Sequence, residues 1–414
     1  MNLKNIVHRI CIQLFVMIFL FFIPFLTARK PVILVPGFTG SAVYATITKP
    51  DLYPQCPNIP VHFQFYPYNQ TFLKQYPDCV GLFMTTYFNN ESKKVESLPG
   101  IKIETAPYGD VDTLPSYSGV VERLLSEGYE LNKTLFGFPY NWILYYSGIP
   151  EIFEDLKNRI EEATEQTGEK LILFGHSMGS HVVRMLINNH VDQNWVQKHI
   201  DRIVYNAPAF YGCSDLIRNV LTGTLEDDNY YEGLAKAIRQ MPSVFLLFEN
   251  YNIIKDKPVF YNKINQAQLY AENINNKFTS MKDNENTIVN PRNVVEFLHE
   301  RGFLNEESLR VFETVESSLK DDKIVEPPVP TILFYNSGLP TPVYFNSTTY
   351  EIIKGEGDGF CQSDILDVVC GKWKNTKCID WKKNDENFGH IPMLKSKEEL
   401  DMIIDFFEQK NKEL

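Results

Sequence analysis

The chain has 414 residues, of which 44% are hydrophobic, 13% aromatic and 22% charged. This aromatic content excludes a disordered chain, because disordered segments lack the apolar side chains that build a core. The formal net charge is −12, without clusters of Lys and Arg. We therefore exclude a nucleic-acid-binding protein and a protein that charge alone holds on anionic membranes.

Residues 1–28 differ in composition from the rest of the chain. Lys4, His8 and Arg9 precede an apolar run over 10–26, and Thr27-Ala28 form a weak cleavage site. This order predicts a secretory signal peptide that is removed from the mature protein. The alternative is an uncleaved signal anchor, because a run of 17 residues is near the lower limit for spanning a bilayer.

Export would place the chain in an oxidising compartment. Seven cysteines are present, and loss of Cys11 with the signal leaves six, at positions 56, 79, 213, 361, 370 and 378. An even number in such a compartment indicates disulfides rather than metal ligands. Four sequons also predict an exported glycoprotein, at Asn69, Asn90, Asn132 and Asn346.

Strand and helix patterns alternate on both sides of a long interruption. Apolar runs over 31–37, 170–175, 201–208, 327–338 and 350–355 predict strands, and helices are expected over 118–128, 149–167, 180–189 and 396–409. This alternation predicts one α/β sheet, with a core of 29–212 and 326–414. Residues 213–325 are predicted to be a mostly helical cap, and the Pro- and Tyr-rich residues 50–90 an irregular excursion from the core.

The sharpest motif is Gly175-His176-Ser177-Met178-Gly179. G-x-S-x-G forms a nucleophile elbow when a strand precedes it and a helix follows, because the tight turn admits only glycine on either side of the serine. Both flanking elements are predicted here. We expect Ser177 to be the nucleophile. His176 lies in the elbow itself and cannot reach the Ser177 hydroxyl, so we interpret it as a packed histidine.

In this kind of fold the serine is followed along the chain by an acid and then by a histidine. Of eight histidines, only His299 and His390 follow Ser177 by more than 25 residues. His299 falls inside the helical cap, whereas His390 precedes the last helix in a Gly-His turn. We expect His390 to be the base.

The acid should follow a strand and precede the histidine loop. Asp358 does so, in a glycine-rich turn after 350–355. Its task is to orient the imidazole and to stabilise the imidazolium. Glu356, Asp364 and Asp367 remain alternatives. The oxyanion donors are expected to be the backbone N–H groups of Met178 and of Phe38, which follows the first strand.

The chain resembles the lecithin:cholesterol acyltransferase family, which includes lysosomal phospholipases with transacylase activity. The stretches that carry this resemblance are PVILVPGFTGSAVYATITKPD (31–51), FPYNW (138–142), FGHSMGS (174–180), NAP (206–208), YNSGLPTPVYF (335–345), GDG (357–359) with Cys370 beyond it, and GHIPML (389–394). The runs GLPTP and HIPML, together with the first-strand sequence, are specific to this family.

The resemblance implies an α/β-hydrolase core with a disulfide-closed membrane-binding excursion and a larger cap. By position, the family's triad falls on Ser177, Asp358 and His390, and its small disulfide on Cys56–Cys79. The excursion has no Trp, so its docking aromatics would be Phe63, Phe65 and Phe72. A packed satellite core is the alternative role for these three side chains.

The chain departs from the family pattern at several positions. Asn141 and Ile143 flank Trp142 where the family has Asp and Arg, and Phe360-Cys361 replace the usual Thr-Val. No cysteine follows the cap within 320–345. Cys370 must therefore pair with Cys213, Cys361 or Cys378, or remain free.

These observations predict an interfacial acyl-ester hydrolase or O-acyltransferase. Ser177 would take an acyl chain from a glycerophospholipid at a membrane or lipoprotein surface and pass it to water or a lipid alcohol. No cofactor or metal is expected. The alternatives are a soluble carboxylesterase or neutral-lipid lipase of the same fold, and an inactive lipid-binding protein. The expected location is the secretory pathway, with the protein secreted or lysosomal.

Overall fold

The computed structural model describes residues 29–146, 151–225, 229–248, 259–261, 289, 291–319, 322 and 324–408. The proposed signal peptide, 1–28, lies outside the described residues. In the described part, no helix combines the length and apolar character that crossing a membrane requires.

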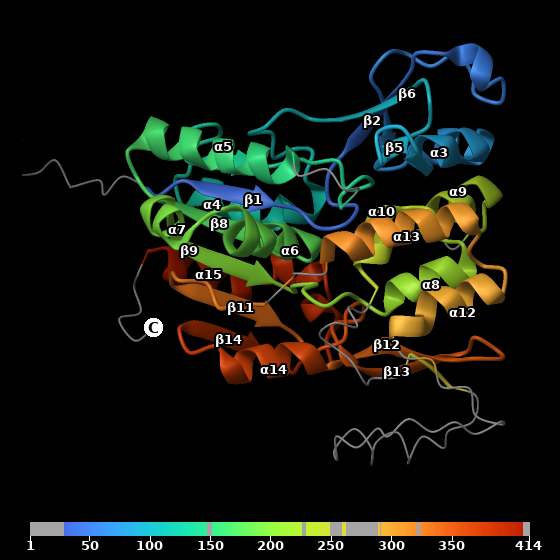
Figure 1. Ribbon diagram of the computed structural model, residues 1–414. Helices are drawn as coiled ribbons and strands as arrows, with labels where there is room; N and C mark the ends of the chain where they lie inside the picture. The colour runs from blue at the N-terminus through green and yellow to red at the C-terminus, as the bar shows by residue number, and fades with distance from the viewer. Residues whose placement is uncertain are drawn as a thin grey trace, which may run out of the picture.

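A parallel six-stranded sheet forms the centre of the molecule (Figure 1). Its order is β14-β11-β9-β8-β1-β7, and all neighbouring pairs are parallel. The strands are β1 (Val32–Val35), β7 (Leu135–Gly137), β8 (Leu171–His176), β9 (Ile200–Asn206), β11 (Thr331–Tyr335) and β14 (Thr376–Asp380). The inner strands are buried along their length, which explains their continuous apolar runs.

Helices cover both faces of this sheet. Ile33 and Val35 of β1 point into one apolar cluster, and Val32 and Leu34 point into another, as the two-residue period of a strand requires. The first cluster includes side chains of α5 (Glu151–Thr167), α6 (Met178–Met185) and α7 (Gln193–His199). The second includes α4 (Ser118–Ser126) and α15 (Lys397–Phe407). The α/β-hydrolase architecture expected from the sequence is confirmed.

Two strands of the central sheet were not predicted, and one predicted strand lies elsewhere. β7 is only three residues long, and β14 (TKCID) is a half-buried edge strand with little apolar sequence. The strand expected over 350–355 is β13 (Ile352–Gly357), but it pairs antiparallel with β12 (Leu339–Asn346) in a separate sheet. β13 is mostly half-exposed, so it cannot be an inner parallel strand.

The excursion is more regular than its composition predicts. It contains β3 (Phe63–Tyr66), α2 (Gln70–Gln75), α3 (Pro77–Met84) and the start of a hairpin of β4 (Thr86–Asn89) and β5 (Lys94–Ser97). β3 pairs with β2 (Val43–Ile47), which also pairs with β6 (Ile101–Thr105). Short 3-10 helices occur at Pro50–Leu52, Pro115–Tyr117, Pro291–Asn293, Glu386–Phe388 and Pro392–Lys395.

Cys56 and Cys79 form a disulfide, the pair that the resemblance implies. Phe65, however, is only 1% exposed, and its ring lies 5.2 Å from that of Phe83. The expectation that Phe65 docks on a membrane was therefore wrong, because this side chain points into the core. Phe63 and Phe72 are half-buried and pack on each other with ring centroids 4.7 Å apart.

The described residues between 213 and 325 are mainly helical. They form α8 (Asp215–Thr222), α9 (Glu232–Ile238), α10 (Pro242–Leu246), α12 (Val294–Glu300) and α13 (Glu306–Leu319), with β10 (Phe260–Tyr261) beside β12. These helices lie beyond the carboxyl ends of the central strands (Figure 1). α3 packs on α9 so closely that a Cβ atom at Gly81 would lie 2.3 Å from the carbonyl carbon of Gly233.

A buried ion pair joins this region to the core. Arg184 of α6 and Asp322 are both fully enclosed, with Nη1–Oδ1 and Nη2–Oδ2 distances of 2.5 and 2.7 Å. The two parallel contacts make this a bidentate pair. After Met185 the helix continues as a wider π turn, Leu186–His190.

Candidate active site

Ser177 occupies a strained turn between β8 and α6. Its φ of 52° lies in the left-handed region, which is costly for a residue with a side chain. The flanking glycines leave no room for substitution: a Cβ atom would lie 2.7 Å from Ser180 Cα at Gly175 and 2.0 Å from the Val35 carbonyl oxygen at Gly179. The strand–Ser–helix context that the motif requires is therefore present.

The structure brings Ser177, His390 and Asp358 into one chain of hydrogen bonds. His390 Nε2 lies 2.9 Å from Ser177 Oγ, and His390 Nδ1 lies 2.7 Å from Asp358 Oδ2. All three side chains are buried. A serine, an imidazole and a carboxylate at these distances can move a proton from the hydroxyl to the imidazole.

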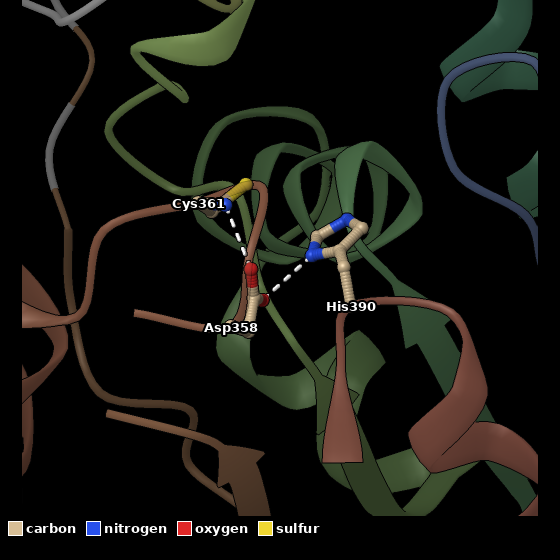
Figure 2. A group of neighbouring side chains, drawn as sticks. All are labelled: Asp358, Cys361 and His390. Atoms are coloured by element: carbon tan, nitrogen blue, oxygen red, sulfur yellow. Dashed lines mark hydrogen bonds and ion pairs between the residues drawn. The ribbon is translucent and has the colours of Figure 1, made fainter. Parts of the chain in front are cut away.

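The Asp358 carboxylate is held from its other side by backbone groups. Asp358 follows β13, and its Oδ1 accepts hydrogen bonds from the N–H groups of Phe360 at 3.0 Å and Cys361 at 2.7 Å. The backbone N–H of His390 also donates to the Asp358 carbonyl oxygen, at 2.9 Å. Figure 2 shows the carboxylate between Cys361 and His390. Both oxygens are therefore oriented before any substrate binds.

His176 has a partner that the sequence did not reveal. Its Nε2–H donates to the backbone carbonyl of His390 at 2.9 Å. Burial, followed by the proximity of His390, lowers the pKa of His176 to about 3. This ring is therefore neutral at physiological pH and supports the backbone of the His390 loop.

The backbone N–H groups of Phe38 and Met178 remain the expected oxyanion donors. Phe38 lines the same cavity as Ser177, and its ring packs edge-on against Trp142 at 5.2 Å. Met178 is the first residue of α6, where a backbone N–H has no acceptor within its own helix. Trp142 also contacts Tyr66 of the excursion, at 5.1 Å. Asn141, at the departure from the family pattern, accepts hydrogen bonds from the N–H groups of Ile143 and Leu144.

A cavity of about 450 Å³ opens beside Ser177. Besides the residues above, its wall includes three polar side chains of α8 that sequence reasoning missed, Asp215, Arg218 and Asn219. Arg218 contacts Asp215 through Nε at 2.7 Å and Nη2 at 2.8 Å. No local sequence pattern marks these residues, because their helix reaches the site only through the tertiary fold.

One cluster of potential metal ligands occurs among the described residues: Asp358, Cys361 and His390, with ligand atoms within 4.8 Å of one another. Cys361 is bonded to Cys213, so its sulfur is not a thiolate. The side chains of Asp358 and His390 are hydrogen-bonded to each other. This cluster therefore matches a hydrogen-bonded catalytic pair better than a metal site. The remaining disulfide joins Cys370 to Cys378, which answers a pairing that the sequence left open.

Comparison with known proteins identifies the family. A family model described as lecithin:cholesterol acyltransferase matches residues 68–316, which is more than half of the chain. The chain belongs to the lecithin:cholesterol acyltransferase family. The matched residues include Ser177 but end before Asp358 and His390, so the assignment of the last two rests on their geometry and on the GDG and GHIPML motifs.

Several members of the lecithin:cholesterol acyltransferase family are similar to this chain. Phosphatidylcholine-sterol acyltransferase of Gallus gallus is 27% identical over 47% of this chain and 50% of that protein. Lysosomal phospholipase A and acyltransferase of Bos taurus is 28% identical over 47% of this chain and 51% of its own length. The chain thus spans about half the length of these two relatives. The same enzyme of Canis lupus familiaris is 23% identical over 91% of this chain and 88% of its own.

Solved structures with a similar arrangement are more distant. A lipase of Bacillus licheniformis has a TM-score of 0.34 and 9% identity over 92% of each chain. A monoacylglycerol lipase of Paleococcus ferrophilus has a TM-score of 0.33 and 13% identity over 72% of this chain and 90% of that chain.

Proposed function

We propose that this protein is an interfacial serine hydrolase and O-acyltransferase that removes an acyl chain from a glycerophospholipid. The observation that carries the proposal is the hydrogen-bonded series Ser177–His390–Asp358 beside a cavity of about 450 Å³. Membership of the family and the activities in the names of the bovine and canine relatives, a phospholipase A and acyltransferase, support the substrate class.

In the first half-reaction, Ser177 Oγ attacks the carbonyl carbon of the ester while its proton passes to His390 Nε2. Asp358 Oδ2, on the opposite ring nitrogen, stabilises the imidazolium that forms. The backbone N–H groups of Phe38 and Met178 bind the oxyanion of the tetrahedral intermediate. Collapse of this intermediate breaks the ester C–O bond, and His390 returns the proton to the leaving alcohol oxygen.

The second half-reaction reverses these roles. The acyl-enzyme on Ser177 is attacked by water, or by the hydroxyl of a lipid alcohol, which gives up its proton to His390. The bond between the acyl carbon and Ser177 Oγ then breaks, and His390 returns the proton to Oγ. The choice of acceptor decides whether the product is a fatty acid or a new ester.

A lipid surface is the proposed partner, and the excursion is the proposed docking element. Its most exposed large hydrophobic side chains in the described structure are Leu52 and Val61, with 54% and 80% exposure. Phe63 and Phe72, in the same excursion, are half-buried. Because the chain carries a net charge of −12, apolar insertion rather than charge attraction would drive binding.

We further propose export through the secretory pathway with N-glycosylation. Asn69, Asn90 and Asn132 are exposed, and Asn346 is half-buried. At Asn69 and Asn346 the side-chain oxygen accepts backbone hydrogen bonds. These bonds do not use the amide nitrogen, to which a glycan is attached. A mass decrease after enzymatic removal of N-glycans from the secreted protein would test this.

The function is tested with phosphatidylcholine vesicles, with and without a lipid alcohol, by mass spectrometry of the products. The proposal predicts release of fatty acid and lysophospholipid, and an acylated alcohol when the acceptor is present. A Ser177→Ala variant should give neither. Turnover of soluble esters without turnover of vesicles would favour a soluble carboxylesterase, and vesicle binding without any turnover would favour an inactive lipid-binding protein.

A further inference from the structure

A disulfide connects the start of the cap to the loop that holds Asp358. Cys213 lies two residues before α8, and Cys361 lies three residues after Asp358, so the bond joins positions 148 residues apart in the chain. Both cysteines are buried, at 0% and 5% exposure. The sequence alone did not select this pair.

The Cys361 end of the bond is in direct contact with the catalytic acid. The N–H of Cys361 donates to Asp358 Oδ1 at 2.7 Å, and the Cys361 carbonyl accepts from the Asp358 N–H at 3.2 Å. The other carboxylate oxygen faces His390 (Figure 2). The position of the Cys361 backbone therefore determines how the carboxylate is presented to the imidazole.

The Cys213 end is anchored in the cap. Its N–H donates to the Leu247 carbonyl at 2.8 Å, and the next N–H, of Ser214, donates to Gln362 Oε1 at 3.1 Å. The helix that follows, α8, carries the three polar side chains of the cavity wall. The Cys213–Cys361 bond thus joins the segment that leads into the cavity wall to the turn that carries Asp358.

Apart from this covalent bond, hydrogen bonds hold the turn: the Gly359 N–H donates to Thr341 Oγ1 at 2.8 Å, and the Ser363 N–H donates to the Glu356 carbonyl at 3.2 Å. Gly359, between Asp358 and Cys361, has a φ of 91°, which glycine adopts without strain. Because glycine lacks a Cβ atom, it also allows the turn many other backbone conformations. Without the disulfide, Cys361 would be held by hydrogen bonds and by its packing in the apolar cluster, without a covalent link to the cap. Other turn conformations would then compete, and the carboxylate would leave its position against His390 in a fraction of the molecules.

We propose that the Cys213–Cys361 disulfide is a positioning element of the active site: it holds the Cys361 backbone so that Asp358 stays aligned with His390. The inference rests on the proposed serine-hydrolase function. It assigns this bond a role in the rate of the chemical step, besides the general stabilisation that any disulfide provides.

The test compares two paired variants in the full chain, C213A/C361A and C370A/C378A. The second removes the disulfide that joins α14 (Asp364–Lys372) to β14, between residues only eight positions apart. Turnover of a soluble p-nitrophenyl ester is measured well below the unfolding temperature of each variant. We expect C213A/C361A to lose about 10- to 100-fold in kcat with little change in KM, since small misplacements of catalytic groups cost factors of this size. C370A/C378A should retain the wild-type kcat.

A double-mutant cycle separates positioning from stability. If the bond acts through Asp358, its removal should lower kcat far less in an Asp358→Asn background than in the wild type. The same fold-loss in both backgrounds, a change confined to KM, or an equal loss in C370A/C378A would overturn the inference. A wild-type protein without Ser177-dependent ester turnover would overturn the proposed function itself, and the inference with it.

If C213A/C361A does not fold, folded C370A/C378A protein is treated with dithiothreitol. The reagent gives two electrons to a disulfide and is itself oxidised to its cyclic disulfide, leaving two thiols. Turnover is read before each aliquot is alkylated and mapped. Activity should fall with the appearance of alkylated Cys361. Full kcat in protein whose Cys361 is reduced would contradict the proposal.

Discussion

His390 Nε2 lies 2.9 Å from Ser177 Oγ, although 213 residues separate the two in the chain. Ser177 directly follows β8, an inner strand of the central sheet, and His390 lies in the loop before the last helix. Their contact is the basis of the proposed mechanism.

The catalytic residues should act as a unit. Ser177→Ala and His390→Ala should each lower kcat on a soluble ester by about a million-fold, and the double variant by little more. Asp358→Asn should cost about ten-thousand-fold, because it disturbs the tautomer of His390 without removing the base. His299→Ala is the control, since His299 lies on α12 and bonds to the Leu304 carbonyl. Near-normal turnover in His390→Ala would contradict the assignment.

Removal of the exposed apolar residues of the excursion should weaken surface binding. L52S/V61S is expected to sediment less with phosphatidylcholine vesicles and to turn them over more slowly, because each buried aliphatic side chain contributes about 1.5–3 kcal/mol. Hydrolysis of a soluble ester should be unchanged, since neither residue lines the cavity. Val368→Ser, on α14 and similarly exposed at 52%, is the matched control.

Phe65→Ser should behave differently from the docking variants. Phe65 is enclosed in the core, so its loss is expected to lower the free energy of unfolding by about 3–5 kcal/mol. Chemical denaturation measures this change. A folded, stable Phe65→Ser protein with reduced vesicle binding would restore the docking role that the structure argues against.

Glu399 should make the protein less stable as the pH rises. It is buried, and its carboxylate oxygens accept hydrogen bonds from Asn206 and Trp381. Burial raises its pKa from 4.5 to about 8, although these bonds act in the opposite direction. The unfolded chain therefore releases this proton above pH 4.5 while the folded chain keeps it until about pH 8. The contribution of Glu399 to the free energy of unfolding is present in full below pH 4.5 and is lost between pH 4.5 and about pH 8, by an amount on the order of 5 kcal/mol.

Glu399→Gln tests this dependence because glutamine is neutral at every pH. Relative to the wild type, the variant should gain stability between pH 5 and pH 8, as measured by urea unfolding. Glu398→Gln, at the exposed neighbouring position, should follow the wild type. Parallel stability curves for Glu399→Gln and the wild type would contradict the prediction.

Removing one partner of the Arg184–Asp322 pair should lower the free energy of unfolding more than replacing both partners by apolar residues. Asp322→Ala leaves a buried guanidinium without its carboxylate and is expected to cost about 3–5 kcal/mol. The double variant R184M/D322L, which removes both charges, should recover much of that loss. Denaturation midpoints measure both effects. If the double variant were as unstable as Asp322→Ala, the ion pair would stabilise the fold by more than the desolvation cost of its two charges.

The sequence predicted the residues that chemistry constrains locally. The elbow, the last histidine and the acid each occupy a turn next to a recognisable element, so motif and chain order were sufficient to select Ser177, His390 and Asp358.

β14 was not predicted because an edge strand needs few apolar residues. β13 was assigned to the wrong sheet because strand character does not specify a partner. Phe65 was misplaced because a run of aromatics looks the same whether it faces the core or a membrane. The pairing of Cys213 with Cys361 and the polar wall from α8 depend on contacts across 148 residues or on tertiary packing, which no local pattern encodes.

Formation of an acyl-enzyme on Ser177 is tested by the mass of the Ser177 peptide after rapid mixing with a p-nitrophenyl ester and acid quenching. The proposed mechanism predicts that this peptide gains the mass of the acyl group on the timescale of turnover, and that Asp358→Asn slows the gain. Ser177→Ala should show neither acylation nor turnover. An acyl group on another residue, or sustained turnover by Ser177→Ala, would contradict the account.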